Sequence, residues 1–94
     1  MFGFTDKELS CLIAILRQND IQKCVLFGSR AMGSYKNGSD VDIAVIGNER
    51  KLSYCLNELS NLPYFFDVLN LENIHNQKLL EHIQRVGKRL DAVG

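Results

Sequence analysis

Residues 28–42 read GSRAMGSYKNGSDVD and join two short apolar runs, residues 23–27 and residues 43–46. The segment opens with a Gly-Ser pair and closes, after ten further residues, with Asp40 and Asp42. Because side chains alternate along a strand, the two acids are expected close together on one face. Two such carboxylates repel each other unless a cation lies between them, and hard cations such as Mg²⁺ prefer oxygen ligands. The pattern therefore predicts a divalent-metal site.

The Gly-Ser pair predicts an anion site beside that metal. The backbone amides of a turn at Gly28 and the hydroxyl of Ser29 suit phosphate oxygens. Metal and phosphate side by side indicate phosphoryl or nucleotidyl transfer. A plainer interpretation stays open for both parts, namely a turn that ends a strand at Gly28 and an Asx turn at Asp40 followed by a surface carboxylate.

The pattern Gly-Ser-x10-Asp-x-Asp resembles the signature of the polymerase-beta-like nucleotidyltransferase superfamily. The form Gly-Ser-Arg-Ala-x-Gly with Ser-Asp-x-Asp is similar to that of its smallest branch, the minimal nucleotidyltransferase (MNT) proteins. The resemblance extends from the apolar run before Gly28 to the segment around Asp67. It implies one MNT domain over residues 1–94.

The resemblance also implies how the site is built. Asp40, Asp42 and Asp67 would be the catalytic acids and would hold two Mg²⁺ ions. Asp67 interrupts the apolar run YFFDVL at residues 64–69, and a carboxylate there needs a partner or a cleft. The other interpretation of Asp67 is a strand-end acid satisfied by backbone amides or an arginine.

Three further residues of the motif are expected to bind the nucleotide. Gly28 would let the backbone approach the phosphates, and Ser29 would donate to them. For Arg30 two roles stay open, a contact with the phosphates or an ion pair with the aspartates. Lys36 is interpreted as a solvated loop charge, and Ser39 as the cap of the turn before Asp40.

The function that the resemblance implies is transfer of AMP from ATP to a hydroxyl, with tyrosine as the expected acceptor, of a cognate HEPN-domain toxin. The chain would then be the antitoxin of a type VII-like toxin–antitoxin pair and would form a hetero-oligomer with the toxin. ATP rests on the resemblance alone. Two alternatives stay open: nucleotidylation of a small molecule held by a helical partner, and neutralisation of the toxin by binding without catalysis.

Composition limits the other classes of function. The 94 residues suit one domain, and eleven basic residues balance eleven acidic ones. A protein that follows a nucleic-acid backbone usually carries a basic excess, so a nucleic-acid substrate is not expected. The start of the chain has no signal-peptide pattern, and no apolar stretch is long enough to cross a membrane. Cys11, Cys24 and Cys55 are interpreted as buried thiols of a cytoplasmic protein.

The periodicity of the chain predicts an α+β (mixed α/β) fold in which helices pack on a small mixed β-sheet. A capping box at residues 5–8 begins a helix that runs to about Gln18, and a third helix containing Leu79 and Val86 is expected to end at Gly87 as its C′ residue. A second helix is expected up to Leu62, closed by Asn61 and Pro63. The remaining expectations are strands at residues 23–27, 40–46, 64–71 and 89–93, a short helical turn from Ser29 or Arg30, and surface or packing roles for His75 and His82.

Overall fold

The fold is a four-stranded mixed sheet, seen in a computed structural model that describes residues 1–92. The strands lie in the order β3-β2-β1-β4 and comprise β1 (Lys23–Phe27), β2 (Val41–Ile46), β3 (Phe66–Asn70) and β4 (Lys88–Arg89). Strand β1 runs antiparallel to β2 and to β4, whereas β2 and β3 are parallel. This confirms the α+β class and the mixed sheet predicted from the sequence.

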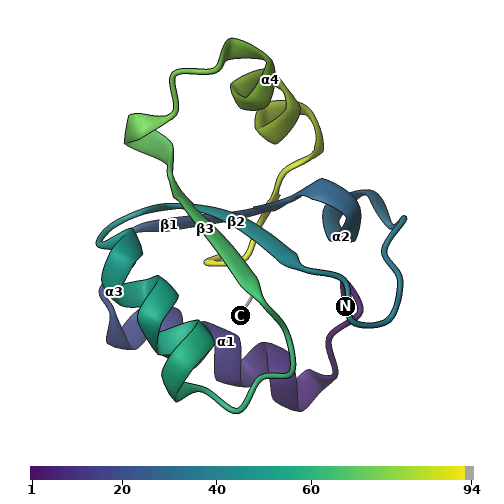
Figure 1. The fold of residues 1–94 in the computed structure, drawn as a ribbon, viewed down its shortest axis with the longest axis vertical. Helices are drawn as coiled ribbons and strands as arrows, with labels where there is room; N and C mark the ends of the chain where they lie inside the picture. The colour runs from purple at the N-terminus through teal and green to yellow at the C-terminus, as the bar shows by residue number, and fades with distance from the viewer. Residues whose placement is uncertain (93–94) are drawn as a thin grey trace.

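Helices cover both faces of the sheet (Figure 1). Helices α1 (Asp6–Gln18) and α3 (Glu49–Tyr54) lie against one face, and α4 (Gln77–Val86) lies against the other. Alternation along the strands divides the core accordingly. The α1/α3 side receives Val41, Ile43 and Val45 of β2, while the α4 side receives Val25, Phe27, Ala44 and Ile83.

The predicted capping box begins α1 as expected. The Glu8 amide donates to Thr5 Oγ1 at 3.1 Å, and the Thr5 amide donates to Glu8 Oε1 at 2.9 Å. These bonds satisfy amides that a helix start otherwise leaves without partners. Leu12 and Leu16 then bury the apolar stripe of the helix against the sheet.

The second helix departs from the prediction. It is an α-helix only through Tyr54 and continues as the π-helical turn η1 (Cys55–Leu59). The Ser60 amide donates to the Cys55 carbonyl at 2.9 Å, five residues back. A π turn accommodates one residue more than an α turn, so it changes the direction of the side chains that follow. Sequence periodicity carries no signal for that extra residue.

Three of the strands are shorter than predicted. Strand β3 starts at Phe66, and at its end the Asn70 side chain accepts from the Glu72 amide at 2.9 Å, which begins the 3₁₀ helix η2 (Leu71–Asn73). Strand β2 likewise starts one residue later than expected, at Val41. The fourth strand, predicted at residues 89–93, is observed only at Lys88–Arg89; residues 90–92 form a bend and a turn, and Val93 lies outside the described residues.

Gly87 follows α4 as predicted but not as a left-handed C′ residue. Its φ of −61° and ψ of 143° are open to any residue. The reason for a glycine is space, because a Cβ at this position would collide with the Ile83 carbonyl oxygen. The Gly87 amide donates to that same oxygen at 2.8 Å.

Only one of the three cysteines is a buried thiol in the structure. Cys24 is fully buried, and burial raises the pKa of its thiol to about 12. Cys11 is exposed and Cys55 is half-buried, which corrects the expectation of three buried thiols. Within residues 1–92, no helix has the length and apolarity that crossing a bilayer requires.

Asp91 is predicted to make stability depend on pH. It accepts from the Cys24 amide at 3.0 Å and from Arg89 Nε at 2.7 Å, and the Arg89 hydrogen bond lowers the pKa of its carboxyl from 3.8 to about 2. A carboxylate whose pKa is depressed in the folded state stabilises above its unfolded pKa and loses that contribution as the pH falls through the folded pKa. We therefore expect Asp91→Asn to flatten the loss of unfolding free energy between about pH 4 and pH 2. Urea unfolding across this range tests it, with Glu58→Gln, an exposed acid, as the control; equal slopes for Asp91→Asn and the parent chain would contradict the prediction.

Candidate active site

The parallel register of β2 and β3 brings two of the predicted acids together. Asp42 lies directly opposite Asp67, and both residues alternate onto the α4 face of the sheet, as Ala44 and Leu69 do two positions further on. Asp40 precedes β2 by one residue. The pKa of the Asp42 carboxyl is raised, first by partial burial and then by the charges of Asp67 and Asp40. The three acids therefore share one electrostatic environment.

The acids do not form a finished ligand set by themselves. Within residues 1–92, no group of three or more histidine, cysteine, aspartate or glutamate side chains is arranged so that it could hold a metal ion. The backbone places the acids near one another, and their mutual repulsion is what a divalent cation would relieve. The donor set, three carboxylates, fits Mg²⁺ in kind.

Gly28 brings the backbone against one of these carboxylates. It lies at the junction of β1 and the short helix α2 (Gly28–Met32), with a positive φ of 71°. A Cβ at this position would collide with Oδ2 of Asp42. Both the left-handed conformation and the close approach require glycine here. Ser29 follows half-buried in the first turn of α2, so the motif's turn and its acids adjoin.

The structure gives Arg30 contacts that agree with neither of its two predicted roles. Its side chain is only 3% exposed, and it donates from Nε and Nη2 to the Ser39 carbonyl at 3.2 and 2.8 Å. Its Nη1 donates to the Phe2 carbonyl at 3.0 Å. The guanidinium also lies over three aromatic rings, at 4.5–5.3 Å from the centroids of Phe4, Tyr35 and Tyr64.

Arg30 is thus a clamp on the loop that leads to the acids. Ser39, whose carbonyl it holds, directly precedes Asp40. Ser39 in turn closes the loop as predicted, because its Oγ accepts from the Lys36 amide at 2.8 Å. Lys36 itself is exposed, as expected.

A second clamp holds Phe66, the residue before Asp67, and the sequence did not reveal it. Asn57 Oδ1 accepts from the Phe66 amide at 2.8 Å, while Asn57 Nδ2 donates to the Phe66 carbonyl at 2.9 Å. Asn57 lies in the π turn η1, and that turn directs it at the edge of β3. Because the turn itself was not predicted, nothing in the sequence pattern singled out this asparagine.

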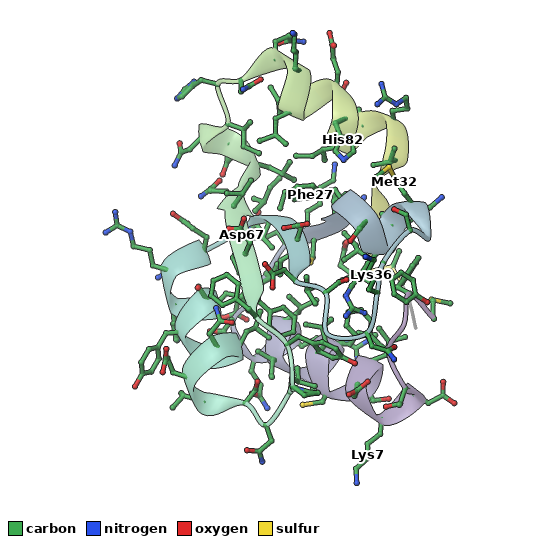
Figure 2. All side chains as sticks on the ribbon, turned by 45° about the vertical axis from the view of Figure 1, so that its right-hand side comes forward. Lys7, Phe27, Met32, Lys36, Asp67 and His82 are labelled. Carbon is green, nitrogen blue, oxygen red and sulfur yellow. The ribbon has the colours of Figure 1, made fainter. Side chains whose placement is uncertain are left out.

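The two histidines separate in the structure. His75 is exposed and lies between η2 and α4. His82 of α4 is half-buried and packs edge-on against Phe27, with ring centroids 6.2 Å apart. Figure 2 shows the side chains of His82 and Phe27 next to each other on the α4 side of the sheet. The predicted packing role of His82 is confirmed, and its position beside the acids was not foreseen.

Comparison with known proteins assigns the chain to a family. Residues 11–91 match the model of the family described as polymerase beta, nucleotidyltransferase, and the chain belongs to that family. Among curated proteins, none matches the chain.

Solved structures add a closer likeness. The crystal structure of a toxin–antitoxin with AMP-PNP shares 27% sequence identity with this chain at a TM-score of 0.71, over 87% of this chain and 71% of that one. A mutant of the toxin–antitoxin MntA-HpeT in which two aspartates are replaced by glutamates shares 25% identity at a TM-score of 0.69, over 87% and 71% of the two chains. A third structure, an MntA-HpeT mutant with a tyrosine changed to alanine, agrees in fold, with 24% identity, a TM-score of 0.63 and coverage of 90% and 70%. The family model and the first two structures confirm the resemblance to MNT antitoxins predicted from the motif.

Arg30→Lys is predicted to destabilise the fold although it keeps the charge. Lysine lacks the planar fork, so it cannot hold the Ser39 and Phe2 carbonyls together or stack on the three rings. We expect the free energy of unfolding to fall by about 2 kcal/mol. Urea denaturation measures it, with exposed Arg50→Lys as the matched control. Equal stability of the two variants would refute the clamp.

Gly28→Ala and Gly33→Ala form a matched pair. Both glycines have a positive φ, 71° and 79°, so both substitutions incur backbone strain of about 1 kcal/mol. Only at Gly28 would the new Cβ displace the Asp42 carboxylate, since nothing lies within 4 Å of one at Gly33. We expect Gly28→Ala alone to weaken binding of AMP-PNP with Mg²⁺, by about tenfold or more in calorimetry. If both variants bind the nucleotide alike, the close approach at Gly28 has no bearing on the ligand.

Proposed function

We propose that this chain is a Mg²⁺-dependent nucleotidyltransferase that transfers AMP from ATP to a tyrosine hydroxyl of a HEPN-domain toxin, and that it acts in the cytoplasm as the antitoxin of that toxin. One observation carries the proposal: Asp42 faces Asp67 across β2 and β3 and at the same time adjoins the Gly28 backbone. A three-carboxylate metal site next to a phosphate turn is what nucleotidyl transfer needs.

Each side chain has a defined task in this proposal. Asp40, Asp42 and Asp67 would hold two Mg²⁺ ions, which neutralise phosphate charge and lower the pKa of the attacking hydroxyl when bound. Gly28 lets the backbone lie against the Asp42 carboxylate, so that the turn can approach the phosphates bound there, and the Ser29 hydroxyl donates to a phosphate oxygen. Asp67 is exposed on the edge strand β3, where an acceptor from outside the chain reaches it.

The bonds of the reaction balance within this arrangement. The acceptor oxygen forms a bond to the α-phosphorus of ATP, and the bond from that phosphorus to the β-phosphate bridging oxygen breaks. The hydroxyl proton passes to the Asp67 carboxylate, and pyrophosphate leaves on the side of Gly28 and Ser29. The product is an acceptor carrying one AMP.

The choice of donor and acceptor rests on the similar structures. The first of them contains AMP-PNP, an ATP analogue, and the first two are both toxin–antitoxin structures of at least 25% identity. The second carries two aspartate-to-glutamate changes, two positions apart as Asp40 and Asp42 are here. These matches favour a protein acceptor over a small molecule.

The experiment incubates the chain with the toxin gene product, Mg²⁺ and ATP, and then measures the intact mass of the partner. We expect the partner to gain one or more nucleotide monophosphates. The double variant Asp40→Asn with Asp42→Asn, and separately Asp67→Asn, should reduce the initial rate by about a thousandfold or more, because the metal ligands are lost. Glu58→Gln, an exposed acid far along the chain from the motif, should leave the rate unchanged.

The same assay separates the competing functions. A double variant that neutralises the toxin fully without modifying it would show an antitoxin that acts by binding alone. A partner of unchanged mass, with AMP recovered on a small hydroxylated molecule, would show the other transferase. GTP, CTP and UTP in parallel reactions identify the donor.

A further inference from the structure

His82 lies on the same face of the sheet as Asp42, against the residue that precedes Gly28. Its ring packs edge-on against Phe27, with centroids 6.2 Å apart and planes at 84°. Phe27 is the register partner of Asp42 across β1 and β2, and it immediately precedes Gly28. Packing on Phe27 therefore places the imidazole next to the end of β1, where the Gly-Ser turn begins, and Figure 2 shows His82 and Phe27 close together.

The helix that carries His82 is firmly placed. Ile83, the next residue, is buried in the core cluster on the α4 face together with Phe27. At the start of α4, Asn76 accepts from the Leu79 amide at 3.2 Å and caps the helix. The position of the imidazole relative to β1 is thus set by packing.

The polar atoms of His82 remain available to a ligand. None of the hydrogen bonds found within residues 1–92 engages its ring, and no buried side-chain nitrogen or oxygen in that part of the chain lacks a partner. The half-buried ring therefore keeps its nitrogens accessible to solvent. Through Phe27, the register partner of Asp42, the ring lies on the face of the sheet that carries the Asp42 side chain.

The strand order gives the site two ends. Asp67 lies on β3 at the outer edge. Asp42 lies on β2 in the middle, directly after Asp40, which precedes that strand. The Gly28 turn lies at the end of β1, where His82 packs against Phe27. In the proposed reaction the acceptor approaches Asp67, so the β- and γ-phosphates extend towards β1. The other basic side chains of the motif do not lie at the β1 end of the site. Arg30 is buried with its guanidinium against three aromatic rings, and Lys36 is exposed in the loop.

We propose that His82 donates a hydrogen bond from its imidazole to the β- or γ-phosphate of the bound nucleoside triphosphate and holds the departing pyrophosphate. The proposal rests on the function proposed above and adds a residue outside the motif to its substrate contacts. An imidazole N–H at this position would donate to phosphate oxygens, which the carboxylates, being anionic acceptors themselves, cannot bind directly.

Two substitutions separate the polar contact from the packing. His82→Phe keeps an aromatic ring against Phe27 and removes the donor. His82→Gln removes the ring and keeps an N–H donor. Calorimetric titration with Mg²⁺ compares AMP-PNP, which has β- and γ-phosphates, with AMP, which lacks them.

We expect His82→Phe to weaken AMP-PNP binding by about tenfold and to leave AMP binding unchanged. His82→Gln should recover most of the lost affinity. His75→Phe, at the exposed histidine, serves as the matched control and should bind both nucleotides as the parent chain does. Unfolding midpoints of all variants verify that each is folded. Should His82→Phe misfold, His82→Leu, which also lacks the donor, takes its place with the same expected loss for AMP-PNP.

Several outcomes would overturn the inference. Unchanged affinity of His82→Phe for AMP-PNP would exclude the phosphate contact, and equal losses for AMP-PNP and AMP would show that the residue acts through packing. Either result, together with nucleotide transfer by the parent chain, overturns His82 alone and leaves the proposed function standing. Failure of the parent chain to bind any nucleotide overturns the proposed function and this contact with it.

Discussion

The site depends on the register in which β2 and β3 pair. A slip of one residue along either strand would turn Asp42 and Asp67 to opposite faces of the sheet, because side chains alternate with a period of two. The register is enforced from the other face, where Val41, Ile43 and Phe66 are fully buried against the α1/α3 side. Burial of such side chains contributes on the order of 2 kcal/mol each, which exceeds the repulsion between partly exposed carboxylates. The hydrophobic core therefore holds together acids that would otherwise separate.

The register alone does not fix the backbone directly before each acid, and the side chains of Arg30, which is buried, and Asn57, which is half-buried, hold it there. Arg30 grips the carbonyl of Ser39, and Asn57 grips the amide and carbonyl of Phe66. Each clamp acts on the backbone of the residue directly before an acid. Because each clamp binds backbone atoms of that residue, it fixes the position of the main chain at the acid and leaves the carboxylate free to bind a ligand. Metal sites generally need such outer support to keep their ligands in place.

The parts of this structure that were predictable depend on local pattern. The bounds of β1, the capping box of α1 and the acid inside β3 follow from alternation, from capping chemistry and from the cost of a charge in an apolar strand. The π turn at Cys55–Leu59, the buried position of Arg30 and the approach of His82 to Phe27 did not follow. The last two arise from contacts between segments far apart in the chain, residue 30 with residue 2 and residue 82 with residue 27, and the π turn has no counterpart in the spacing of the apolar residues. Periodicity records which face a residue belongs to, and it does not record which distant partner that face meets.

The order of the strands also gives the site a direction. The sheet edge at β3 presents Asp67 in the open, and Phe65, two residues earlier, is 59% exposed. At the end of β1, the helices α2 and α4 contribute Gly28 and His82. Under the proposed function, the acceptor, which is large, would meet the open end at β3, and the triphosphate would lie towards the end of β1. The mixed sheet brings these parts together. The parallel pair β2 and β3 puts Asp42 and Asp67 side by side, and the antiparallel pair β1 and β2 puts the end of β1, with the Gly28 turn that follows it, next to Asp42.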